Sequence, residues 1–229
     1  MESIEKALDE WQAALCKELD VSALYARSPM AHKWQATYRS MCLRETVSWR
    51  FVDLTNQSLL LHKNGKALGA RILLRSALET LAILIYLNQL TRKVVEGHLD
   101  WAKFSDKTVT LLGGSRDGST DQQATNIITV LQKCNVRYPG IEGLYAILSE
   151  SAHPNYEGMR FVYSETDRPN FITYFKNRAS ELYSSKHLDG ISLSMKVFHV
   201  EYNIEWPSAF EALETWLEEN DAKLVINRV

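Results

Sequence analysis

The sequence predicts an all-α protein, a multi-helix bundle that carries one small β-hairpin or extended flap near residues 159–176. Apolar residues recur at the i, i+3, i+4 and i+7 spacing of amphipathic helices along most of the 229-residue chain. Around residues 159–176, two short runs of aromatic and β-branched residues instead flank a polar centre, which is typical of a hairpin. No internal repeat or long linker divides the chain. We therefore expect a single helical domain over residues 1–229, with central helices over 66–153 that carry the candidate site and C-terminal helices over 178–229.

Breaks in the apolar pattern divide the first half of the chain into helices. Ser28-Pro29 makes one break and Asn64-Gly65 the next, because proline and Asn-Gly turns end helices. The run that follows Asn64-Gly65 is the most apolar in the chain and is expected at the centre of the bundle. The helices expected in this half cover residues 2–18, 33–61, 66–89 and 91–112.

The second half opens with the run GGSRDGSTD, whose glycines and small polar residues predict a surface loop. Asp121 has the side chain of an N-cap, so we expect a helix from there to about residue 135. Pro139 suits the first turn of the next helix, and Pro154 ends it, because the residue before a proline avoids the α conformation. Helical periodicity returns at about residue 178 and ends in a helix opened by Pro207.

Composition narrows the class of protein. With 45% hydrophobic and 24% charged residues, the chain resembles an ordinary globular protein. The formal net charge of −2 gives no overall basic field of the kind found in nucleic-acid-binding proteins, although a local basic patch stays open. The three cysteines are widely spaced and have no CxxC or histidine companions, so neither a disulfide framework nor a zinc site is indicated. We expect no cofactor and no bound metal.

The location of the protein follows from two further features. The first residues, MESIEKALDEWQ, are acidic and amphipathic and lack the basic start and apolar run of a secretory signal. The longest uncharged apolar stretch, residues 80–91, is shorter than the roughly 20 residues that a membrane helix needs. We therefore expect a cytoplasmic protein without a membrane span.

Two apolar stretches far apart in the sequence each carry three polar residues at steps of four. This spacing places each trio on one helix face. In the first stretch the polar stripe is narrow and flanked by apolar residues, so its charges need partners if they are buried. We predict that the two faces meet across a helix pair and form the candidate functional site. The two trios are Arg71, Arg75 and Glu79, and Tyr145, Ser149 and His153.

These residue types are those of a proton-handling or anion-binding site. His153 is expected at a helix end just before Pro154, and a histidine between a carboxylate and a guanidinium is suited to proton transfer. Two other interpretations stay open: a structural network that pins the two helices together, and two unrelated surface faces. The candidate catalytic residues are Arg75, Glu79, Tyr145, Ser149 and His153, and the candidate ligand-binding residues are Arg71 and Asn155.

The run GARILLRSALETLAILIYL, followed later by YAILSESAHPN, resembles uncharacterised bacterial all-helical proteins of the HEPN-like superfamily. The two polar trios and the following Pro154 carry this resemblance. It implies a helical protein that accompanies toxin–antitoxin, phage-defence or nucleotide-handling systems. Catalytic members of the superfamily resemble metal-independent ribonucleases that use an arginine and a histidine near a helix end. The resemblance thus implies His153 as general acid or base, with Arg75 and Arg71 stabilising negative charge at phosphorus.

Other chemistries find no support in the sequence. Ser149 lacks a Gly-x-Ser-x-Gly elbow, Gly113-Gly114-Ser115 lacks the ending of a phosphate loop, and no HExxH motif is present.

Two functional hypotheses remain. The first is a HEPN-like protein that binds or cleaves RNA or a nucleotide at the two stripes. The second is a non-enzymatic helical interaction or scaffold module, a homodimer whose stripes are a structural network and whose aromatic surface binds protein. An open cleft that contains Arg75, Glu79, Tyr145 and His153 favours the first hypothesis. The same residues sealed and bonded to one another favour the second.

Overall fold

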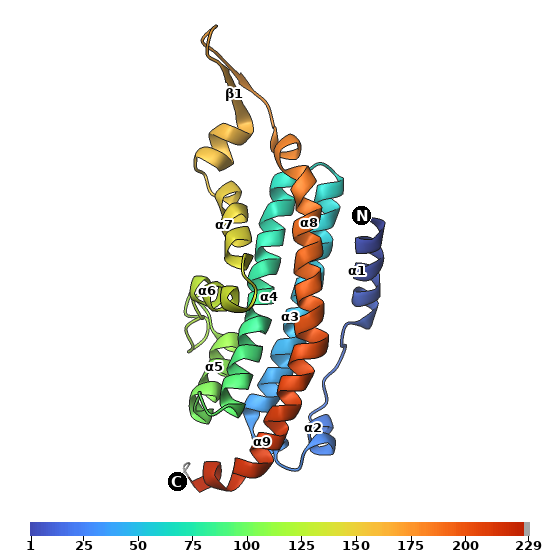
Figure 1. Ribbon diagram of the computed structural model, residues 1–229, viewed down its shortest axis with the longest axis vertical. Helices are drawn as coiled ribbons and strands as arrows, with labels where there is room; N and C mark the ends of the chain where they lie inside the picture. The colour runs from blue at the N-terminus through green and yellow to red at the C-terminus, as the bar shows by residue number, and fades with distance from the viewer. Residues whose placement is uncertain (227–229) are drawn as a thin grey trace.

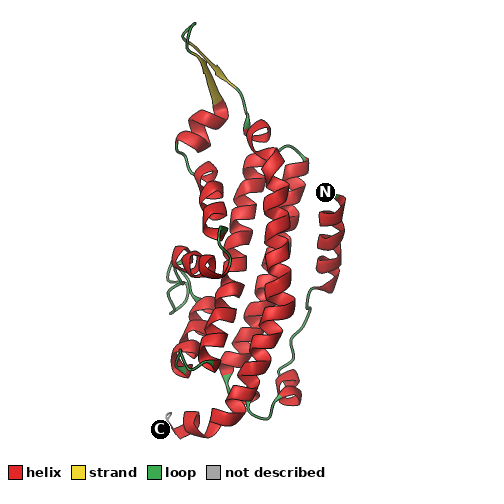
Figure 2. Ribbon diagram, viewed as in Figure 1, coloured by secondary structure: helices red, strands yellow, loops and turns green. Residues whose placement is uncertain are grey.

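The two longest helices form an antiparallel pair, α3 (Gln35–Lys63) and α4 (Ala67–Val95), each of 29 residues. The turn between them passes through Gly65, whose φ of +67° lies in the left-handed region that glycine adopts without strain. The computed structural model describes residues 1–226, and in it these helices run along the long axis of the molecule beside α8 (Ala179–Val200) (Figure 1). The predicted all-α bundle with a small hairpin is confirmed (Figure 2).

Helix α4 is the centre of the core because its sequence is apolar on nearly every face. It packs against α3, α6, α7, α8 and α9, and side chains such as Leu81 and Ile85 are fully buried. No helix within the described residues is both long and apolar enough to cross a membrane.

The remaining elements surround the α3–α4 pair. Helix α1 packs on α3, on the side of the bundle away from α7 (Figure 1). The elements are α1 (Glu2–Ala14), α2 (Ser22–Arg27), the 3₁₀ turn η1 (Ala31–Lys33), α5 (Trp101–Gly113), α6 (Ile127–Arg137), α7 (Ile141–Ala152), the π turns η2 (Tyr156–Phe161) and η3 (Glu201–Glu205), and α9 (Trp206–Ile226).

Several predicted helix boundaries are wrong. Helix α4 continues to Val95, so the helix predicted from residue 91 begins only at Trp101. Its cap is Asp100, whose carboxylate accepts from the two following backbone amides. Asp121 lies outside any helix, because Asn126 is the side chain that caps α6. The first helix ends at Ala14 rather than residue 18, since Leu15 is extended.

The hairpin consists of β1 (Ser164–Asp167) and β2 (Ile172–Phe175), which pair antiparallel with Ser164 opposite Phe175. It lies within the predicted flap and projects beyond one end of the bundle (Figure 1). We call residues 156–178, from η2 to the start of α8, the arm.

Candidate functional site

Helix α7 runs antiparallel to the first half of α4 and brings the two predicted faces together. Arg75 donates from Nε to Ser149 Oγ at 2.9 Å and from Nη2 to Tyr145 Oη at 2.7 Å. The Tyr145 hydroxyl donates to Glu79 Oε1 at 3.0 Å, and this carboxylate lies 3.3 Å from Arg75 Nη2. The predicted contact between the two helix faces is confirmed.

Arg71 is buried one turn earlier on α4 and uses neutral partners. Its Nε donates to Ser151 Oγ at 2.7 Å, its Nη2 donates to the Ile147 carbonyl at 2.8 Å, and its guanidinium lies 4.0 Å from the ring centre of Tyr183. Within residues 1–226 no carboxylate lies at ion-pair distance from it, and burial lowers its pKa. We call Arg71, Arg75, Glu79, Tyr145, Ser149 and Ser151 the α4–α7 clamp.

The structure does not bring His153 or Asn155 into this clamp. His153 ends α7 with an extended backbone (φ −91°, ψ 149°), and its side chain is exposed. The extended conformation is the one that Pro154 imposes on the residue before it, and it takes His153 off the helical face of Tyr145 and Ser149. Asn155 instead caps η2, accepting from the Gly158 amide at 2.9 Å.

The clamp is partly exposed to solvent. The side chains of Arg75 and Glu79 are 25% and 27% exposed, whereas Tyr145 is buried. A hollow of about 280 Å³ between α3, α4, α5 and α6 meets the clamp only at Glu79. Its lining includes Arg50 and Thr80, which are bonded to each other, but not Arg75, Tyr145 or His153. The four residues of the first hypothesis therefore do not share this cleft.

The clamp also lies at the base of the arm. Arg71 contacts Ser151, next to the end of α7 where one leg of the arm leaves, and Tyr183 in α8, where the other leg returns. Tyr183 donates to Glu157 in η2 at 2.8 Å, and burial together with this bond raises the pKa of Tyr183 to about 12. A small separate core around Val162 fills the base. Arg71 therefore ties α7 and α8, the two helices between which the arm runs, to α4.

Beyond its base, the arm exposes large apolar side chains on several sides. Phe171 at the tip is 94% exposed and has a φ of 54°, which is uncommon for a residue with a side chain. A hollow of about 630 Å³ lies nearer the root, bordered by Met159, Tyr163 and Phe175. The exposed apolar residues of the arm are Tyr156, Met159, Phe161, Phe171, Ile172, Tyr174 and Phe175.

A second polar network, which the sequence analysis missed, lies deeper in the bundle around Glu201 of η3. This carboxylate is fully buried and accepts from Arg137 Nε at 2.8 Å, Tyr138 Oη at 2.6 Å and Asn88 Nδ2 at 2.7 Å. Burial and the bond to Glu201 raise the pKa of Tyr138 to about 12. Arg137 also reaches Glu205 at 3.0 Å. We call these five residues the Glu201 network.

No protein-family model, curated protein or solved structure matches this chain. The residues of the clamp and of the arm are therefore the features that bear on the function of this chain.

Proposed function

We propose that this protein is a cytoplasmic, non-enzymatic helical interaction module that forms a homodimer through its arm. The observation that carries the proposal is the apolar surface of the arm, on which Phe171 and Phe175 are almost fully exposed. A two-stranded hairpin is at best marginally stable alone, and contiguous exposed apolar surface marks interaction sites. Burial of this surface on a partner would stabilise both the arm and the complex.

A second copy of this chain fits the arm because the arm carries a projecting side chain at its tip and a hollow nearer the bundle. Phe171 projects at the tip, and the hollow beside Met159 and Tyr163 lies near the root. If two arms cross antiparallel about a two-fold axis, each tip comes to the root of the other arm. A two-fold interface needs such self-complementarity, in which the same contact forms twice.

The charges of the arm also suit a second copy. Glu165 pairs with Lys176 within the hairpin at 2.9 Å, and the other charges near it are of both signs, Asp167 being acidic and Arg160 and Arg168 basic. A two-fold pairing can place opposite signs against each other, which favours the correct register. The mixture of signs gives no strong field toward a polyanion such as a nucleic acid.

The clamp has a supporting role in this proposal. Its side chains bond to one another, as the second hypothesis requires, and Arg71 contacts both helices that flank the arm, α7 and α8. Because the guanidinium groups hold α7 on α4, the clamp sets the direction in which the arm leaves the bundle. We propose that it orients the docking surface rather than a substrate.

The test is the oligomeric state of the full chain, measured by sedimentation equilibrium. We expect a wild-type dimer and at least about tenfold weaker association for the double variant Phe171→Ser, Phe175→Ser. The matched control is Val136→Ser, which removes an equally exposed apolar side chain from α6 and should leave the dimer intact. A monomeric wild type, or a dimer that the arm variant does not weaken, contradicts the proposal.

A second candidate function is binding or cleavage of RNA or a nucleotide, in line with the HEPN-like resemblance. It is favoured by the solvent-exposed edges of Arg75 and Glu79 and by the unengaged side chain of His153, at the end of the same helix pair. Wild type and His153→Ala would be incubated with a mixed RNA pool and a nucleotide panel. Loss of activity in His153→Ala but not in the exposed control His98→Ala supports this candidate. Equal behaviour of all three proteins removes it.

A further inference from the structure

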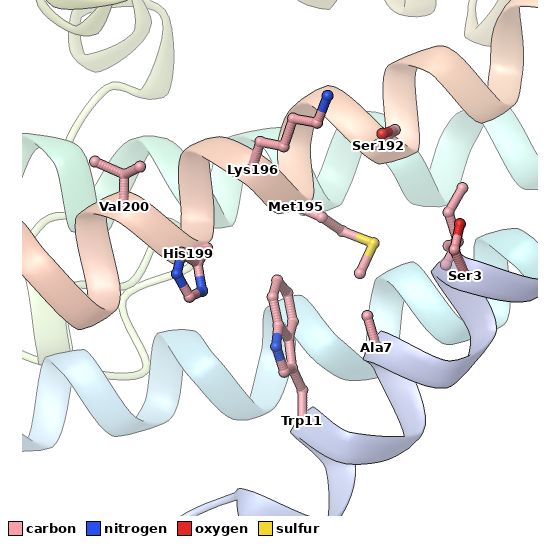
Figure 3. Close-up of a pocket in the computed structure, with 9 residues that line it drawn as sticks. Ser3, Ala7, Trp11, Ser192, Met195, Lys196, His199 and Val200 are labelled. Carbon is pink, nitrogen blue, oxygen red and sulfur yellow. The ribbon is translucent and has the colours of Figure 1, made fainter.

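A hollow of about 400 Å³ lies between α1 and α8 (Figure 3). Helix α1 lies on the side of the bundle away from α7, which carries part of the clamp (Figure 1). Its size is within the range of small-molecule pockets in proteins. It shares no residue with the clamp, the arm or the Glu201 network. A ligand bound there would therefore be independent of the dimer proposed above.

The floor of this hollow is flat and apolar. Figure 3 shows the Trp11 indole standing between α1 and α8, with the Met195 thioether directed toward α1. Trp11 also packs on Phe198 with the ring centroids 5.3 Å apart, which fixes the indole in place. Aromatic rings favour such a surface because an indole face and a thioether both make good contacts with a π system.

The rim of the hollow offers hydrogen-bond donors and a positive charge. Lys196 of α8 lines the hollow, and Figure 3 shows its ammonium directed away from Trp11, so the side chain has to turn to reach a ligand. Among the described residues no carboxylate lines the hollow. His199 Nδ1 lies 3.1 Å from Asn203 Nδ2, and a neutral imidazole that accepts the amide hydrogen at Nδ1 carries its own proton on Nε2. Figure 3 shows the His199 ring directed toward Trp11. The rim thus presents an N–H donor and a flexible cation.

We propose that this hollow binds a small monoanion with a flat apolar body, such as an aromatic carboxylate. The ring lies against Trp11 and Met195, where it is removed from water. The carboxylate accepts from His199 Nε2 and pairs with Lys196, whose long side chain can swing over the hollow. A cation gains nothing from this rim, and a dianion meets only one permanent positive charge.

The test uses 2-naphthoate as the probe, with 2-naphthylmethylamine as the cationic analogue of the same shape. Protein with isotope-labelled methionine methyl groups is titrated and followed by NMR. We expect naphthoate to shift the Met195 methyl signal in a saturable way while the arm residue Met159 stays unchanged. The amine should bind much more weakly. Lys196→Gln should weaken naphthoate binding about fivefold, which corresponds to one exposed ion pair.

Two controls keep the test decisive. Lys186→Gln removes an exposed lysine from the same helix, away from the hollow, and should bind naphthoate like the wild type. Ala7→Phe fills the hollow from α1 and should abolish the Met195 shift without unfolding the chain. No saturable Met195 shift, equal binding of the amine, or equal weakening by Lys186→Gln overturns the proposal.

Discussion

The α4–α7 clamp and the Glu201 network both place arginine between helices, but they balance its charge differently. In the clamp, Arg71 is buried against a hydroxyl, a carbonyl and an aromatic ring, and no carboxylate of residues 1–226 forms an ion pair with it. In the Glu201 network, a fully buried carboxylate meets Arg137 and two neutral donors. The difference indicates that a guanidinium can be served by neutral oxygens, whereas this carboxylate depends on a complete set of donors.

The largest predicted effect follows from the buried carboxylate. Glu201→Ala leaves the donors of Asn88, Arg137 and Tyr138 without their acceptor, and loss of one partner of a buried pair lowers the free energy of unfolding by about 3 to 5 kcal/mol. Urea denaturation measures this free energy of unfolding. Glu219→Ala removes an exposed glutamate from α9 and serves as the control, with no measurable loss. A loss below about 1 kcal/mol for Glu201→Ala would remove the distinction between the two networks.

The next largest effect is a dependence of stability on pH that arises from His187, which lies near Arg71. His187 is buried, its Nε2 lies 3.0 Å from Ser58 Oγ, and its ring stacks on His62. Burial, and then the charges of His62 and Arg71, lower the pKa of His187 to about 4 from the ordinary 6.5.

The sign of the pH effect follows from proton uptake. Between pH 6.5 and 4 the unfolded chain binds a proton at this histidine that the folded chain does not. Stability is therefore full above pH 6.5 and falls as the pH drops toward 4, by about 3 kcal/mol in total. An NMR titration of the imidazole gives the pKa directly. Unfolding measured across this pH range should show a flatter profile in His187→Gln, and an unchanged profile contradicts the assignment.

Removal of Arg71 should have a smaller effect on stability and a specific effect on the arm. Arg71→Met keeps the apolar stem but loses two charged hydrogen bonds, which lowers the free energy of unfolding by about 2 kcal/mol. Because Arg71 joins the two helices that flank the arm, amide exchange over residues 156–178 should become faster than in Arg75→Met. Equal exchange in the two variants would show that Arg71 does not orient the arm.

The α4–α7 contact could be predicted from the sequence because polar residues at steps of four in an apolar helix require partners. The partners that lie off this pattern could not. Ser151 stands two residues from the stripe, the Ile147 carbonyl has no sequence signal, and Tyr183 comes from a different helix. Steps of four place His153 on the stripe, but Pro154 imposes an extended backbone on His153, which turns its side chain off this face.

The Glu201 network gave no comparable signal. Glu201 and Glu205 are the usual four residues apart, but they lie in a π turn, whose wider spacing changes which residues share a face. Their partners Arg137 and Tyr138 end α6, about 60 residues earlier in the chain. A single sequence shows only isolated charged residues at these positions. The helix periods predicted the bundle, but the depth of each charge depends on contacts between distant segments.

The smallest predicted effect concerns the ion pair within the clamp. Arg75 and Glu79 are each about a quarter exposed, and an arginine placed four residues before a glutamate is the weaker order on a helix. A double-mutant cycle with Arg75→Met and Glu79→Gln should therefore give a coupling free energy of only about 0.5 kcal/mol. The same cycle with Arg137→Met and Glu201→Gln should give a clearly larger value, because water does not reach that carboxylate. Equal coupling in the two cycles would contradict the expectation that burial strengthens the ion pair of the Glu201 network. The Arg75–Glu79 pair would then stabilise the fold as much as the buried pair does.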